Sequence, residues 1–260
     1  AELLHDLNHT FYDQSPSDYL RMRISSMIAI CDETGKFQTQ LSEGYTAWEL
    51  RTQGQGESDP ASVAHYGTIE SLSIVHLAAE AFLRMYLAHS EHDPCPPLRL
   101  AALTSFRVFK GKCTDLRENP PSLAQVQAVL RGTSIRPDGV SPSEWDDDGE
   151  TLLFLLSRAA SIVLDDAASY NATKHGLAAR PAESGLQIGK RPDQPDKWLF
   201  TLESHSVRYL VRGAGNPATG VAWEDRTTFV SAGHNALVAS ILADQIDSLH
   251  SVARARLYGE

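Results

Sequence analysis

Apolar residues recur every three to four positions through most of the chain up to Gly176, a spacing typical of amphipathic helices. The 61–90 segment is apolar almost all round, so we expect it to lie at the centre of a helical bundle. Asp59 and Pro60 give its start signal, because a capping residue followed by proline favours the first helical turn. The full pattern predicts helices over residues 17–30, 37–50, 61–90, 98–117, 123–131 and 143–175.

The pattern changes after Gly176, where β-branched and aromatic residues alternate with polar ones in short runs. A period of two predicts strands, and we expect a small antiparallel sheet over about 184–231. A closing helix is predicted over 235–256. The residues expected to face inward on this helix are Leu237, Ile241, Ile246, Leu249 and Val252.

Helices, a β segment and a final helix predict a mainly α fold, in which a helical bundle carries a small antiparallel β insertion near the C-terminus (α+β overall). We expect N-terminal helices that pack on the bundle over 1–58 and a helical core over 59–183. The β insertion covers 184–231, and 232–260 closes the bundle.

Composition is that of a soluble globular protein, with 42% apolar and 22% charged residues in 260. No apolar run reaches the roughly 20 residues of a membrane span, and the first residues do not resemble a secretory signal. Cys31, Cys95 and Cys113 are scattered and odd in number, which favours a reducing compartment. We therefore expect a cytoplasmic protein without a membrane partner.

The net charge of −10 argues against indiscriminate binding to nucleic acid. Basic residues nevertheless outnumber acidic ones within 99–117 and within 171–212. Runs of this kind are common on solvated surfaces, but they leave room for a partner that carries phosphate.

A polar motif ends the predicted helix over 143–175. Asn171, Lys174 and His175 are spaced i, i+3 and i+4, so they share one helical face. Asn171 and Lys174 also continue the apolar stripe of this helix, which predicts either a polar cleft or buried hydrogen-bond partners. The structural interpretation is that Lys174 and His175 occupy an ordinary last turn before Gly176.

A second polar line follows the 61–90 helix, where Glu80 and Arg84 lie one turn apart. Burying these charges is costly unless they are paired. The structural interpretation is a Glu80–Arg84 ion pair. The functional one places Glu80 or Arg84 opposite His175 across the bundle.

No metal or cofactor is expected. His89, His92 and Cys95 are ligand-like, but no second Cys/His cluster accompanies them, and the acidic run 146–150 lacks calcium-loop spacing. A phosphate-binding glycine loop and a serine nucleophile elbow are both absent, so nucleotide-triphosphatase and serine-hydrolase functions have no support.

The motif resembles that of HEPN (higher eukaryotes and prokaryotes nucleotide-binding) domains. In that superfamily a late helix of the bundle carries an arginine, a polar residue, three variable residues and a histidine. Asn171 and His175 match this pattern, whereas Tyr170 stands in place of the arginine. The acidic residue often found on an earlier core helix corresponds to Glu80.

The resemblance implies a metal-independent endoribonuclease, often a homodimer, of a bacterial toxin or defence type. His175 would transfer protons, which suits its near-neutral pKa, and Asn171 would orient the phosphate or the imidazole. Because Tyr170 replaces the cation that phosphoryl chemistry needs, Lys174 or Arg84 would have to supply it. Tyr170, Glu80 and Arg84 would contribute to substrate binding.

We therefore consider two alternative functions, which belong to different classes. The first is an RNA-binding protein or ribonuclease. The second is a catalytically silent helical module that dimerises and binds a protein or a small ligand. The aromatic residues of the β insertion, which either pack on the bundle or form a surface for a partner, are Trp198, Tyr209, Trp223 and Phe229.

Overall fold

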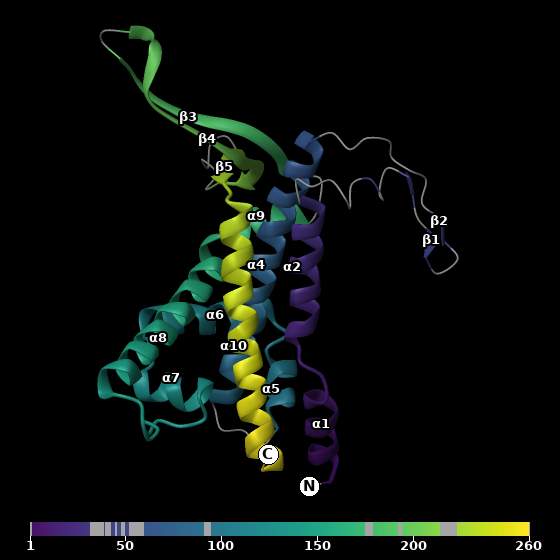
Figure 1. Ribbon diagram of the computed structural model, residues 1–260, viewed down its shortest axis with the longest axis vertical. Helices are drawn as coiled ribbons and strands as arrows, with labels where there is room; N and C mark the ends of the chain where they lie inside the picture. The colour runs from purple at the N-terminus through teal and green to yellow at the C-terminus, as the bar shows by residue number, and fades with distance from the viewer. Residues whose placement is uncertain are drawn as a thin grey trace, which may run out of the picture. The chain divides into compact units, whose positions relative to one another are not determined.

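The computed structural model describes residues 2–31, 39, 43–44, 46–47, 50–51, 60–90, 95–174, 179–191, 194–213 and 223–259. Its architecture is mainly α with a small three-stranded antiparallel sheet near the C-terminus, which confirms the predicted fold class (Figure 1). The helices are α1 (Glu2–Tyr12), α2 (Ser17–Cys31), α4 (Pro60–Ser90), α5 (Pro96–Ala102), α6 (Phe106–Glu118), α7 (Leu123–Leu130), α8 (Pro142–Asp165), α9 (Ala167–Lys174) and α10 (Ala232–Tyr258). The strands are β1 (Thr46–Ala47), β2 (Leu50–Arg51), β3 (Ala179–Arg191), β4 (Gln194–Arg212) and β5 (Trp223–Phe229).

The chain forms two compact units, each built from segments distant in sequence. The first unit contains Ala1–Met22, Val75–Ala167 and Leu237–Glu260. The second contains Arg23–Ile74 and Ala168–Ala236.

The first unit is a helical assembly around the apolar second part of α4. α6 and α7 both contact α8, and α1 contacts α5. Arg131, which follows α7, donates to Gln245 and Ser248 of α10 and so joins that helix to α7. The largest fully buried side chains of this unit include Tyr12, Leu20, Phe82, Leu83, Phe109, Leu130, Leu152, Leu156, Ile162, Leu242 and Ile246.

Local sequence signals explain where several helices begin. α4 begins at Pro60, as predicted. At the start of α8, the Ser141 hydroxyl accepts from the Glu144 backbone N–H while the Glu144 carboxylate accepts from the Ser141 N–H. This capping box stabilises the start of α8, and its hydrogen bonds lower the pKa of Glu144.

Two predicted helices are each divided in two. The 98–117 helix is α5 and α6, because Ser105 takes the extended backbone of an N-cap before Phe106. The 143–175 helix is α8 and α9, which separate at Asp166. Asp165 and Asp166 are adjacent weak helix formers, whose side chains compete for backbone hydrogen bonds.

The helix predicted over 37–50 is wrong at residues 46, 47 and 50, which lie in strands, whereas residues 39 and 43 are helical. β1 and β2 form an antiparallel pair in which Thr46 lies opposite Arg51 and Ala47 opposite Leu50. A short apolar run suits a strand as well as a helix, so its periodicity alone does not distinguish them. The rest of the 37–50 prediction lies outside the described residues, apart from residues 39, 43 and 44.

The sheet of the second unit has the order β3-β4-β5, with antiparallel neighbours. It begins at Ala179, ahead of the predicted 184, and its middle strand β4 runs from Gln194 to Arg212. Ala179 lies opposite Tyr209 on β4, and Arg226 of β5 lies opposite the same tyrosine. β3 and β4 form a long hairpin, to which the shorter β5 adds beside Ser206–Arg212 (Figure 1).

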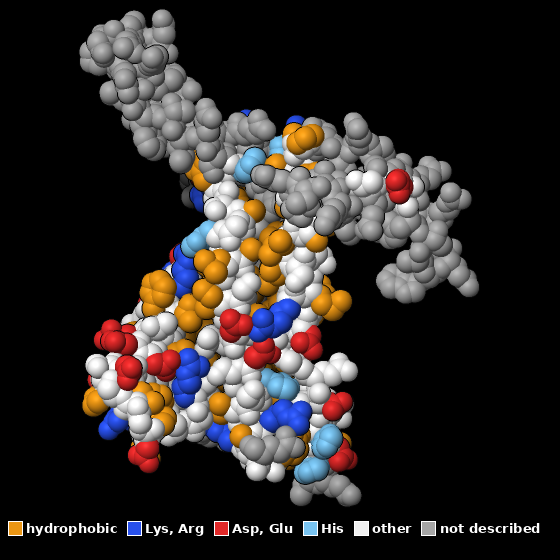
Figure 2. Space-filling model, viewed as in Figure 1, with side chains coloured by type: hydrophobic (Ala, Val, Ile, Leu, Met, Phe, Trp, Pro, Cys, Tyr) orange, Lys and Arg blue, Asp and Glu red, His pale blue; other side chains and the backbone are white. Residues whose placement is uncertain are grey.

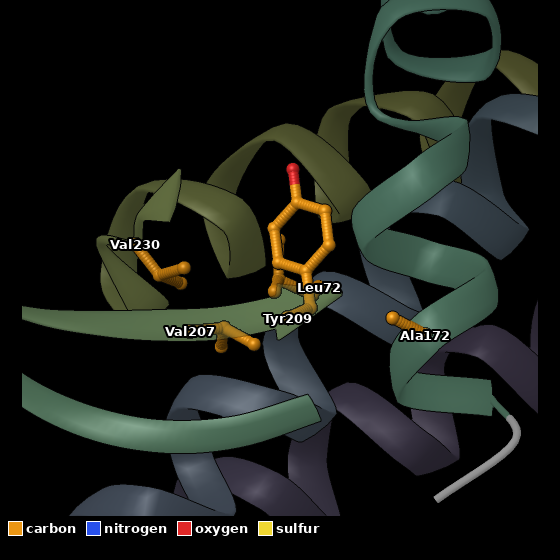
Figure 3. Close-up of a cluster of buried hydrophobic side chains, with 5 residues drawn as sticks. All are labelled: Leu72, Ala172, Val207, Tyr209 and Val230. Atoms are coloured by element: carbon orange, nitrogen blue, oxygen red, sulfur yellow. The ribbon is translucent and has the colours of Figure 1, made fainter. Parts of the chain in front are cut away.

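One face of β4 anchors the sheet. Val207 and Tyr209 are buried with Leu72 of α4, Ala172 of α9 and Val230 (Figure 3). The partly buried residues packed against this cluster are Ile69, Ala168, Ala179 and Val211. Because side chains alternate along a strand, this packing turns the intervening residues of β4 to the opposite face.

The inward face predicted for the closing helix is partly wrong. Ile246 and Leu249 are fully buried in α10, whereas Leu237 is 59% exposed. Leu242 and Ala243 are buried instead, and Ile241 and Val252 are only partly buried. The helical repeat predicted the right element, but the inward orientation predicted for Leu237 in its first turns is wrong.

Among the described residues, one helix is long and apolar enough to cross a membrane. This helix is α4, and 72% of its most apolar stretch is buried inside the protein. Such burial is typical of the core helix of a soluble protein and agrees with its predicted central place.

Tyr12, His89 and His250 form a buried polar cluster in the first unit. The Tyr12 hydroxyl and His89 Nε2 are 2.8 Å apart, and His89 Nδ1 lies 3.1 Å from the Met85 carbonyl oxygen. Since that carbonyl can only accept, the network assigns the proton of neutral His89 to Nδ1 and makes Nε2 the acceptor from Tyr12. Burial, together with the nearby charge of Arg256, lowers the pKa of His89 to about 4.

We expect acid to destabilise the first unit through His89. An unfolded histidine has a pKa of about 6.5, so between pH 6.5 and 4 the unfolded chain binds a proton that folded His89 excludes. This difference removes about 3 kcal/mol of unfolding free energy as the pH falls through that window. Urea denaturation at successive pH values should show a correspondingly smaller loss for His89→Gln than for the wild type. His5→Gln, which changes an exposed histidine of α1, should keep the wild-type slope. Equal slopes for His89→Gln and the wild type would contradict the assignment.

Candidate functional site

The motif of Tyr170, Asn171 and Lys174 lies on α9, in the second unit. Asn171 and Lys174 are exposed. Lys174 Nζ lies 5.8 Å from the centre of the Tyr170 ring, within the range of a cation–π contact. The fourth residue of the motif, His175, lies outside the described residues.

The expectation that Asn171 and Lys174 continue the buried stripe of the preceding helix is wrong. The interruption at Asp166 ends α8, so its helical phase does not carry over into α9. α9 buries Ser169, Ala172 and Thr173 instead. The amide and the ammonium group are therefore accessible to solvent, and the site roles predicted for them remain predictions.

Glu80 and Arg84 form an ion pair on α4 in the first unit, with 2.6 Å between Arg84 Nη2 and Glu80 Oε1. Arg84 also donates to the carbonyl of Leu103, and its guanidinium lies 4.1 Å from the centre of the Phe109 ring. These contacts join α4 to the end of α5 and to α6. The pair therefore has the contacts expected of an ion pair that stabilises the fold. A role in substrate binding stays a prediction.

The electrostatic surroundings of this pair are those of a packed interior. Both side chains are about four-fifths buried. Burial raises the pKa of the neighbouring Cys113 thiol to about 12; the charge of Arg84 opposes the rise, while that of Glu80 adds to it. Cys113 therefore stays a protonated, unreactive thiol at neutral pH.

The two groups of predicted site residues belong to different units. Tyr170 and Lys174 lie together on α9, and Glu80 pairs with Arg84 on α4. His175 lies outside the described residues, so the predicted position of Glu80 or Arg84 opposite it stays a prediction.

A surface on the sheet of the second unit combines arginines with two of the aromatic residues that the sequence analysis named. Arg208, Leu210 and Arg212 are exposed on β4, between residues of the buried face. The register places Arg180 of β3 beside Arg208, and Trp223 of β5 beside Arg212. Directly paired residues share a face. We call this surface the exposed sheet face and define it by Arg180, Arg208, Leu210, Arg212, Trp223 and Phe229.

The aromatic residues of the insertion differ in burial, and a surface for a partner stays a prediction. Tyr209 is buried, and its hydroxyl lies 3.1 Å from the Thr228 hydroxyl. Trp223 is 66% exposed and Phe229 41% exposed. The side chain of Trp198 lies outside the described residues.

Charges on the sheet are unevenly compensated. On the exposed sheet face, Arg208 Nε donates to both carboxylate oxygens of Asp225, at 2.7 and 2.9 Å, and this hydrogen bonding lowers the pKa of Asp225. Arg226, on the other face by register, pairs with Glu224 at 2.7 Å. Among the described residues, Arg180 and Arg212 have no carboxylate partner.

Ion pairs offset part of the positive charge in the first unit, including one arginine of the basic run over 99–117. Arg117 pairs with Asp165 at 2.9 Å, and on other helices of the first unit Arg131 pairs with Asp148 and Arg21 with Asp244. On the face shown in Figure 2, acidic and basic side chains of the helices are intermixed rather than gathered by sign. We see no extended cationic surface on this view of the described helices.

Within the described part of the chain, no group of three or more His, Cys, Asp and Glu side chains is arranged to hold a metal ion. Buried His89 instead bonds to Tyr12 and to the Met85 carbonyl, which occupies both of its ring nitrogens.

The comparisons with known proteins give no further guide. No protein-family model, curated protein or solved structure matches the chain.

We expect Arg84 to act mainly in stability. Arg84→Met should lower the unfolding free energy by about 2–3 kcal/mol, because it leaves the Glu80 carboxylate and the Leu103 carbonyl without their donor. Arg107→Met, at an exposed position on α6, should change it by less than about 0.5 kcal/mol. Chemical denaturation measures both. An Arg84→Met protein as stable as the wild type would point instead to a substrate-binding role.

Proposed function

We propose that the protein binds single-stranded RNA through the exposed sheet face. The observation that supports this most directly is the pairing of Trp223 with Arg212 across β4 and β5, since both side chains are exposed. Nucleic-acid-binding proteins hold single strands by stacking bases on aromatic rings and by placing guanidinium groups on the backbone phosphates. Arg180 adds a second guanidinium without a carboxylate partner among the described residues.

The charge balance favours a single strand over a duplex. Three arginines on the exposed sheet face are offset by Asp225, and the whole chain carries a net charge of −10. Duplex binding depends mainly on many phosphate contacts. Stacking on an exposed ring needs unpaired bases instead and tolerates few cationic contacts.

The resemblance of the α9 motif to HEPN domains points to the same class of ligand. The exposed side chains of Asn171 and Lys174 are accessible to a polynucleotide. Both the motif and the exposed sheet face belong to the second unit.

Fluorescence anisotropy with a labelled single-stranded RNA of about a dozen nucleotides tests the binding. Trp223→Ala should weaken binding by about 1–3 kcal/mol through the lost stacking. Arg212→Gln should reduce the slope of log affinity against log salt by about 0.7 through one lost phosphate contact.

Arg226→Gln is the matched control, because it removes an exposed arginine of the same sheet that pairs with Glu224 on the opposite face. It should bind RNA as the wild type does. Equal binding by Trp223→Ala and the wild type would contradict the proposal, as would equal affinity for duplex DNA. A complete lack of RNA binding would favour the silent module that binds protein or small ligands.

A second candidate is metal-independent cleavage of the bound RNA, favoured by the exposure of Asn171 and Lys174. We expect wild-type protein to cleave total RNA or tRNA in EDTA, and His175→Ala to lose this activity, because the imidazole would transfer the proton of the attacking 2′-hydroxyl. His234→Ala changes an exposed histidine of α10 and serves as the control. Thermal melting must first show all three proteins to be equally folded. RNA binding without cleavage by the wild type would reject the catalytic candidate and leave the binding proposal intact.

A further inference from the structure

The β3–β4 hairpin continues beyond the third strand of the sheet, as Figure 1 shows. β5 pairs with residues 206–212, so among the described strands residues 194–204 of β4 pair with β3 alone. Over 198–204 this pairing with β3 keeps a single register. A ribbon of two strands is only marginally stable in water, and further strands stabilise it.

One hydrogen bond gives the direction of the main-chain groups on this part of β4. The Val230 N–H donates to the His205 carbonyl at 2.9 Å, so the main-chain groups of His205 point away from β3. In an antiparallel sheet these groups alternate between the two sides along a strand. Leu199, Thr201 and Glu203 therefore direct their N–H and C=O groups to the side away from β3. We call this side of β4 over 198–204 the open β4 edge.

The outer edge of β3 differs from the open β4 edge, because a proline stands on it. Pro181 lies opposite Val207, whose main-chain groups point away from β3 by the same alternation. The main-chain groups of Pro181 therefore point away from β4. Proline has no N–H to donate, and its presence on an edge strand hinders the addition of another strand. Each outward residue of the open β4 edge keeps its donor.

We propose that two copies of this chain pair antiparallel through their open β4 edges, about a two-fold axis at Phe200. Outward residues must lie opposite outward residues to exchange hydrogen bonds, and a two-fold axis at a residue position always meets this condition. The axis at Phe200 sets Leu199 of each copy opposite the partner's Thr201. Each such pair exchanges two main-chain hydrogen bonds. The marginal hairpin thereby becomes half of a four-stranded sheet with the order β3-β4-β4-β3.

Charge selects this axis over the neighbouring ones. It places Lys197 of each copy opposite the partner's Glu203, at both ends of the paired segment. Opposite charges directly across two strands stabilise their pairing, and like charges destabilise it. An axis at Leu199 would set Glu203 opposite Pro195, and an axis at Thr201 would set it opposite Leu199. Because one short segment supplies both charges at matching positions, the strand that fits this edge is a second copy of itself.

Sedimentation velocity of the full chain at increasing concentration tests this pairing. We expect a monomer–dimer equilibrium with a Kd on the order of 10 μM. Thr201→Pro removes an N–H of the open β4 edge and keeps the hydrogen bonds to β3, so it should weaken dimerisation about tenfold or more. Gln187→Pro is the matched control. Gln187 lies directly opposite Thr201, and its N–H points to the outer edge of β3, so this variant should dimerise as the wild type does.

Charge reversal tests the position of the axis. Lys197→Glu and Glu203→Lys each set like charges opposite one another at both ends of the paired segment, and each should weaken dimerisation about tenfold. The double variant restores opposite charges and should recover the wild-type Kd. Far-UV circular dichroism checks that every variant is folded. The charge variants keep all main-chain donors, so they test the proposal even if Thr201→Pro does not fold.

A wild-type chain that stays monomeric up to about 100 μM, ten times the expected Kd, overturns the proposal. It is also overturned if Thr201→Pro dimerises as tightly as Gln187→Pro, or if the double charge variant stays as weak as the single ones. Assemblies that grow beyond a dimer with concentration would overturn the closed two-fold pairing. These measurements contain no RNA, so their outcome does not depend on the RNA proposal.

Discussion

One apolar contact decides which face of the sheet in the second unit is exposed to solvent. It is the packing of Val207 and Tyr209 against Leu72 and Ala172. A strand has only two faces, and a shift of register by one residue would exchange them. Once one face of β4 is buried on α4 and α9, the arginines between those residues must face solvent. Neighbouring strands in register then bring Arg180 and Trp223 to the same side. The exposed sheet face is therefore a consequence of the apolar contact behind it.

Most of the fold could be predicted from the sequence because its elements depend on local patterns. Three such patterns each act within one or two turns: the apolar run over 61–90, the proline at its start, and the acids in the first turns of α8. The wrong predictions of secondary structure fall where the local sequence favours two structures about equally. The segment around Thr46 and Leu50 suits two periods, and Asp166 interrupts an otherwise continuous helical repeat. Neither choice is determined by periodicity, because tertiary contacts select between nearly equal local states.

The candidate site was less predictable, because a surface is made of residues distant in the chain. The i, i+3 spacing identified Asn171 and Lys174 and placed them correctly on one helix. It also placed them on a buried stripe, whereas both side chains are exposed. Trp223 and Arg212 were each visible as single residues. Their adjacency follows only from the pairing of β4 with β5. The Glu80–Arg84 pair was predictable, since it lies within a single turn, whereas its contacts with Leu103 and Phe109 are not local.

The unequal lengths of the strands have a consequence of their own. β5 pairs only with Ser206–Arg212, and the Val230 N–H donates to the His205 carbonyl just before them. Among the described strands, the rest of β4, from Gln194 to Ser204, therefore has a neighbour on one side only. Its other edge carries backbone N–H and C=O groups that point away from β3, and such an edge is where another strand adds to a sheet. A fourth strand could join there by main-chain hydrogen bonds alone. Growth of the sheet at that edge would extend it sideways and leave the face that carries Trp223 uncovered.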